Sequence, residues 1–197
     1  MKPYDYEVEY LEMNEDSGLA YLNFGNIINE NVYDVYAKFT LLGYNENVDG
    51  SNMWFGIHAG TSAYNISVKR HNLDDNSAWS FIASNTSTNA AIFPVEIGST
   101  YEIELHKSGD VVVNGMEYKA RIQPDVVTNK NFYVFYRDDK KNFTYGRVWY
   151  IQIFKDDEIL YDFIPVSKDG IGYMYDRVTG QLFGAQGGGT FTVGPRT

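Results

Sequence analysis

Residues 101–106 read Tyr-Glu-Ile-Glu-Leu-His, and this alternation of apolar and polar side chains decides the fold class. Successive side chains of an extended strand point to opposite sides, so Tyr101, Ile103 and Leu105 share one face and the polar residues share the other. Such a strand covers a core with its apolar face and meets water with the other. The segment therefore predicts a half-buried strand of an antiparallel sheet.

Two turn sequences follow this segment. Ser108-Gly109-Asp110 leads into Val111-Val112-Val113, and Asn114-Gly115 leads into Met116-Glu117-Tyr118. Asn-Gly supplies the positive φ angles that a two-residue hairpin turn requires. This region therefore predicts a meander of short antiparallel strands.

The period-two pattern recurs from end to end, with short polar turns between the segments, and no sustained helical stripe is found. A chain of 197 residues is long enough to bury a sizeable core as one domain, which we expect to span residues 1–197. The pattern favours an all-β sandwich over alternating strands and helices. The further predicted strands are 6–12, 19–24, 32–42, 53–58, 63–69, 78–83, 132–137, 147–154, 159–164, 171–175 and 191–193.

The composition of the chain limits the classes of partner and of chemistry that we expect. The chain has 17 Tyr, 12 Phe and 18 Gly, a composition of strands and turns. Its 16 Lys and Arg against 26 Asp and Glu give a net charge of −10, which disfavours nucleic acid and anionic membranes as partners. With no Cys, disulfides and thiol chemistry are excluded. No segment has the length and apolarity of a membrane span, and the opening MKPYDYEVEYLE lacks the apolar region of a signal peptide.

Both ends of the chain resemble one family. Near the start the matching segments are 8–12 (VEYLE) and 21–25 (YLNFG), and the 105–115 hairpin matches in the middle. Towards the end they are 147–154 (RVWYIQIF), 162–165 (DFIP), 169–172 (DGIG), 174–176 (MYD), 179–183 (TGQLF) and 189–195 (GTFTVGP). In this order they resemble a LamG-like, concanavalin A-like lectin/glucanase domain family of gut bacteria and their phages. The resemblance implies a two-sheet antiparallel jelly-roll sandwich, but it implies no activity, because function lives in sites grafted on a fold.

The sequence contains only weak matches to known catalytic motifs. Glycoside hydrolases need two carboxylates on one strand face, and Glu7, Glu9 and Glu12 imitate the laminarinase-like Glu-x-Asp-x-x-Glu signature with Glu in place of Asp. The family resemblance already explains this segment as the first strand. The three His residues lack zinc-ligand spacing, and no nucleophile-elbow sequence occurs. We therefore expect a protein that is not an enzyme and holds no zinc.

Calcium is the one ion that the resemblance leaves open, since LamG-like domains often hold it at a loop rim. Asp74-Asp75-Asn76 and Asp138-Asp139 supply carboxylates, but neither has the ligand spacing of a calcium loop. Ordinary acidic turns explain both better, so no cofactor is expected.

A glycan site would use aromatic faces to stack on sugar rings, with polar side chains to hold hydroxyls. If Phe55 and Ile57 point into the core, Trp54 points out. Alternatively, Trp54 and Trp79 pack under loops. Trp149 alternates with Ile151 and Ile153, which predicts a core position. The predicted glycan contacts are Trp54, His58, Asn65, Trp79, Tyr136 and Arg137.

These observations favour a non-catalytic carbohydrate-binding or adhesion module, on a phage virion (tail, fibre or capsid decoration) or a cell surface. The alternative is a purely structural virion or assembly protein that uses the sandwich as a scaffold, and a degenerate glycoside hydrolase comes third. The expected partners are a glycan or other protein subunits, and a homo-oligomer is compatible with the sequence.

Overall fold

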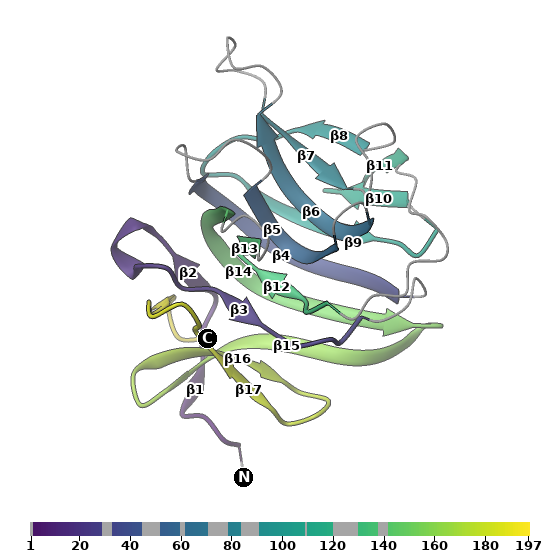
Figure 1. The fold of residues 1–197 in the computed structure, drawn as a ribbon. Coiled ribbons are helices and arrows are strands. Elements are labelled where there is room, and N and C mark those ends of the chain that lie inside the picture. The colour runs from purple at the N-terminus through teal and green to yellow at the C-terminus, as the bar shows by residue number, and fades with distance from the viewer. Residues whose placement is uncertain are drawn as a thin grey trace.

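Antiparallel strands form two sheets that face each other across one hydrophobic core, as Figure 1 shows. The computed structural model describes residues 2–28, 33–44, 52–59, 62–70, 79–83, 91–108, 110–119, 130–137 and 142–197. Within these ranges the helical content is a single 3-10 turn at Glu15–Ser17. Among the described residues, no helix has the length and apolar character that a membrane crossing requires. The predicted all-β sandwich is confirmed.

The larger sheet is built around three long strands. Its order is β11 (Met116–Lys119), β10 (Asp110–Val113), β9 (Thr100–Leu105), β4 (Tyr33–Tyr44), β14 (Asn142–Lys155), β15 (Glu158–Lys168), β16 (Ile171–Asp176) and β17 (Leu182–Gly184). Four short strands lie off this path. They are β1 (Tyr6–Glu7) on β15, β2 (Leu11–Met13) and β13 (Tyr136–Arg137) on β14, and β18 (Thr192–Val193) on β2.

The smaller sheet has the order β3 (Leu22–Asn23), β12 (Tyr133–Val134), β5 (Asn52–Ala59), β6 (Ser62–Arg70), β7 (Trp79–Ala83) and β8 (Ala91–Pro94). The two sheets meet through aromatic rings. Phe39 of β4 stacks on Phe55 of β5 with ring centroids 4.9 Å apart. Such contacts join residues of different sheets, so the core closes only when both sheets form.

Strand β9 has the predicted two faces. Tyr101, Ile103 and Leu105 are buried, and Glu102 is exposed. The predicted Asn114-Gly115 turn is also confirmed, because Val113 pairs with Met116 and the two turn residues have φ of 48° and 79°. Both angles lie in the left-handed region that a type I′ hairpin needs.

The predicted strand 6–12 is wrong as one continuous strand. Tyr6–Glu7 pairs with β15, whereas Leu11–Met13 pairs with β14. Between them the amide of Val8 donates to the carbonyl of Pro165 and that of Glu9 to the carbonyl of Pro195. The chain therefore crosses from one strand to another here.

Candidate functional site: a groove beside Trp149

Two of the predicted glycan contacts are buried. Trp54 is 0% exposed and Tyr136 is 8% exposed, so the predicted outward position of Trp54 is wrong and Tyr136 offers no open face. The backbones of His58, Asn65, Trp79 and Arg137 lie in β5, β6, β7 and β13. Their side chains lie outside the described residues, as do the acidic loops at 74–76 and 138–139. No cluster of His, Asp and Glu suited to a metal ion occurs in the part of the chain that the structure describes.

Trp54 points inward because the strand alternation is broken at this residue. The pairing of β5 with β6 shifts register between Met53 and Phe55. An extra residue in one strand re-aims the side chains that follow it. As a result, Trp54 and Phe55 are both buried and both contact Phe39, with Trp54 at 5.2 Å between ring centroids.

Trp149 shows the opposite change, and its predicted core position is wrong. Val148 pairs with Phe39 and Tyr150 pairs with Lys38, so β14 uses two steps where β4 uses one. Val148 and Ile151 stay fully buried, while Trp149 and Tyr150 are half-buried. The register shift thus places two adjacent aromatic side chains beside a surface groove.

The Trp149 indole is held by three neighbours. Its Nε1 donates to Thr40 Oγ1 at 2.9 Å, and Tyr10 lies 4.9 Å away between ring centroids. The Lys38 ammonium lies over the indole, 5.5 Å from the ring centroid. The hydrogen bond and the ring contact fix the orientation of the indole before any ligand arrives.

The groove opens where β15 and β2 diverge along the edge of β14. β2 pairs with Gly146–Val148, and β15 pairs with Ile151–Lys155, so the two neighbours part at Trp149. The groove has a volume of about 570 Å³, within the range of small-molecule sites. It is lined by Glu7, Val8, Glu9, Lys38, Trp149, Tyr150, Gln152, Asp162, Ile164, Pro165, Arg177 and Thr197.

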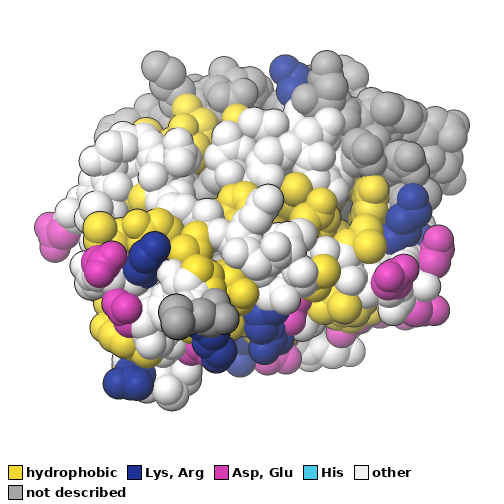
Figure 2. All heavy atoms as spheres, turned by 90° about the horizontal axis from the view of Figure 1, so that it is seen from below, with side chains coloured by type: hydrophobic (Ala, Val, Ile, Leu, Met, Phe, Trp, Pro, Cys, Tyr) yellow, Lys and Arg dark blue, Asp and Glu magenta, His cyan; other side chains and the backbone are white. Residues whose placement is uncertain are grey.

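Figure 2 shows the side of the molecule that carries β1, β16 and both chain ends. Hydrophobic side chains form a broken band across this side, and most charged side chains lie nearer its rim. This side therefore combines apolar surface with hydrogen-bonding groups.

A polar network lies in the groove wall. Asp162 accepts from Gln152 Nε2 at 3.1 Å and from Arg177 Nε at 2.6 Å. The next carboxylate, Asp176, is fully buried and accepts from the amides of Asp162 and Val178. This second carboxylate shapes the turn that carries Arg177, so the guanidinium is positioned at the groove by buried hydrogen bonds.

Glu7, which also lines the groove, is tied to the segment before it. Lys2 Nζ donates to Glu7 Oε1 at 2.9 Å and the Tyr4 hydroxyl donates to the same oxygen at 2.8 Å. These two hydrogen bonds, that of Lys2 first, lower the pKa of the Glu7 carboxyl. Glu7 is therefore ionised at neutral pH.

The three carboxylates that imitate a hydrolase signature do not share one strand. Glu7 lies in β1, Glu9 in the crossing segment and Glu12 in β2. Glu12 Oε2 accepts from Arg147 Nε at 2.6 Å, so this carboxylate is held in an ion pair. The arrangement lacks the single strand face on which the signature depends.

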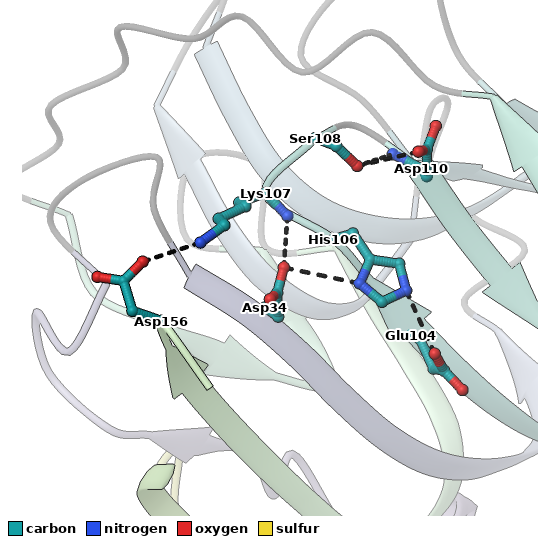
Figure 3. Close-up of polar contacts among 7 residues, drawn as sticks. All are labelled: Asp34, Glu104, His106, Lys107, Ser108, Asp110 and Asp156. Atoms are coloured by element: carbon teal, nitrogen blue, oxygen red, sulfur yellow. Dashed lines mark hydrogen bonds and ion pairs between the residues drawn. The ribbon is translucent and has the colours of Figure 1, made fainter. Parts of the chain in front are cut away.

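A second polar cluster joins the β9–β10 turn to its neighbours, as Figure 3 shows. The Lys107 amide donates to Asp34 Oδ1 at 2.7 Å, and its ammonium lies 2.9 Å from Asp156 Oδ1. The ring nitrogens of His106 lie 3.7 Å from Asp34 Oδ1 and 3.2 Å from Glu104 Oε2. The polar groups of this cluster contact one another, so its role is to hold the strands together. The groove beside Trp149 is therefore the candidate site.

One signal in the sequence could have revealed Trp149. The core residues Val148 and Ile151 are three apart, and a strict two-residue period cannot place both on one face. Two large aromatics stand between them, which is the pattern of an extra residue in a strand.

Comparison with known proteins assigns no family. No protein-family model matches the chain, and no curated protein matches it.

Proposed function

We propose that the chain is a non-catalytic carbohydrate-binding module that holds a glycan in the groove beside Trp149. Its topology would be the concanavalin A-like, LamG-like jelly roll that the sequence resembles. The observation that carries the proposal is the register shift in β14, which puts Trp149 and Tyr150 at an open groove next to hydrogen-bonding side chains. Shifts of this kind often re-aim side chains at functional sites.

The chemistry of a sugar fits these groups. A pyranose presents C–H groups that pack on an aromatic face, and hydroxyls that both donate and accept hydrogen bonds. Gln152 and Arg177 lie in the same groove as Trp149. A sugar that stacks on the Lys38 side of the indole would displace the ammonium, which keeps Glu102 as a partner at 3.1 Å.

Such a module would act on a virion or at a cell surface, and would bind a glycan there or join other protein subunits, including copies of itself. The alternative, a purely structural virion or assembly protein, differs from this proposal because it would function without binding a sugar.

A glycan array followed by calorimetric titration tests the proposal. Trp149→Ala is expected to weaken binding by at least about tenfold, or about 1.4 kcal/mol, because the stacking surface is lost. Trp149→Phe should keep most of the affinity, since a ring remains. Met116→Ser is the matched control, because Met116 is 61% exposed on β11, at the edge of the sheet.

Saturable binding that Trp149→Ala leaves unchanged would contradict the site. If no glycan binds and sedimentation shows self-association, the structural alternative replaces the proposal. Circular dichroism of each variant confirms that the fold is intact before its affinity is interpreted.

A further inference from the structure

We infer that the groove selects neutral glycans and discriminates against anionic ones such as uronates; this rests on the carbohydrate-binding function proposed above. The inference comes from the ionisable side chains around the groove and from how they are paired.

Three ion pairs surround the groove. Lys2 pairs with Glu7 at 2.9 Å, and Lys38 with Glu102 at 3.1 Å. Arg177 pairs with Asp162 through Nη2 at 2.6 Å. Each cation is therefore already matched by a carboxylate of the protein.

The Arg177 pair is the hardest to open. The Asp162 side chain is only 12% exposed, so drawing the guanidinium away would leave a nearly buried carboxylate without its cation. Such a charge is strongly disfavoured in a low-dielectric surrounding. Arg177 therefore stays paired with Asp162, and its remaining N–H groups meet a ligand from an ion pair that carries no net charge.

Glu9 remains as the unmatched charge. It is exposed on the groove wall, and among the described residues no cation pairs with it. Counting side chains alone, three pairs and one further carboxylate leave the groove with one net negative charge, in a chain whose net charge is −10. A sugar carboxylate or sulfate would be repelled there, whereas a neutral hydroxyl could donate to Glu9.

Matched oligosaccharides that differ only at C6 test this inference by calorimetry. The pairs are cello-oligosaccharide with β-1,4-oligoglucuronate, β-1,4-mannan oligomer with oligomannuronate, and α-1,4-oligogalactose with oligogalacturonate. Wherever the neutral member binds, its uronate should bind at least about tenfold more weakly at low salt. The difference should shrink between about 20 and about 500 mM salt, because ions screen the repulsion.

Two charge variants locate the effect. Glu9→Gln should narrow the neutral-to-uronate preference by roughly threefold or more, because it removes the unmatched charge from the groove wall. Glu117→Gln changes the net charge equally but lies on β11, and it should leave the preference unchanged.

The outcomes separate the two proposals. A uronate that binds as tightly as its neutral partner, with binding lost in Trp149→Ala, overturns the charge selection and leaves the glycan site standing. Absence of any Trp149-dependent binding, to these probes and to the array alike, overturns both.

Discussion

At the scale of single residues, two tryptophans lie opposite to their places in the alternating pattern. The alternating pattern places Trp54 on the outer face of its strand, yet Trp54 is fully buried. The same pattern places Trp149 on the inner face, yet Trp149 lines the groove. Both stand at register shifts, in β5 and in β14. One extra residue on a strand is enough to exchange its faces, because the side-chain period is two.

Gly146 makes room for the inward Trp54. A Cβ at Gly146 would lie 2.5 Å from the Thr40 carbonyl oxygen and 3.2 Å from Trp54 Nε1. The first of these neighbours is backbone, which cannot move aside without disturbing β4. The small residue on β14 is thus part of the reason that Trp54 fits the core.

Gly146→Ala is therefore predicted to lower the free energy of unfolding by about 1–3 kcal/mol through overpacking. Chemical denaturation followed by tryptophan fluorescence measures it. Gly43→Ala is the matched control on β4, where the nearest atom to a new Cβ is 3.4 Å away and belongs to the Tyr145 side chain. An equal loss in both variants would show that glycine flexibility, rather than the close contact, matters.

At the scale of elements, two-residue turns set the registers of three hairpins. Asn114-Gly115 and Asp169-Gly170 end in glycine, whereas Asp156-Asp157 connects β14 to β15 with φ of 50° and 66°. Residues other than glycine adopt this left-handed conformation at a cost, although Asp tolerates it better than most. The β14–β15 turn therefore retains avoidable strain.

Asp157→Gly is predicted to raise the free energy of unfolding by roughly 0.5–1 kcal/mol, because glycine adopts φ of 66° without a Cβ clash. The Asp156 pair with Lys107 is left intact. Gly115→Ala should act in the opposite direction, since a Cβ there meets no atom within 4 Å and only the φ of 79° resists it. Urea titration of both variants measures these two changes in the free energy of unfolding. A stabilising Gly115→Ala would refute the conformational explanation.

At the scale of the whole molecule, the groove exists only because remote segments meet. Residues 7–9 cross from β15 towards β14, and the C-terminal segment pairs with them, with the Thr197 amide donating to the carbonyl of Glu7. Arg177 arrives from the turn after β16. Figure 1 shows both chain ends on this side of the molecule. Anchoring of the first residues should therefore affect global stability.

The Glu7 carboxylate gives this anchor a pH dependence. Its pKa is lowered in the folded state by Lys2 and Tyr4, so its stabilisation is present above the ordinary pKa of about 4.3 and is lost as pH falls through the lowered value. Glu7→Gln should lower the thermal midpoint at about pH 7 and have little effect at about pH 2.

The decrease should be small, because 37% of the Glu7 side chain is exposed to solvent. Calorimetric scans across this pH range provide the measurement. In the Lys2→Gln background the effect of Glu7→Gln should become smaller, and an unchanged effect would contradict the assigned pairing.

Much of the architecture followed from local patterns. The two faces of Tyr101–Leu105 and the Asn114-Gly115 turn needed only alternation and turn chemistry. The break in strand 6–12 could not be predicted, because it depends on Pro165 and Pro195 as hydrogen-bond acceptors. The predicted glycan contact at Trp54 is wrong because its orientation also depends on tertiary pairing, in this case on how β5 pairs with β6.

By itself, the sequence determined that this chain is all-β, with antiparallel strands and a hairpin turn at Asn114-Gly115, because these depend on side-chain period and local φ preference. The tertiary structure alone decided which aromatics reach the surface and where the groove opens. The physical reason is that register belongs to a pair of strands. A shift of one residue between neighbours buries Trp54 and brings Trp149 to the groove, and it interrupts the alternation of side chains at both places.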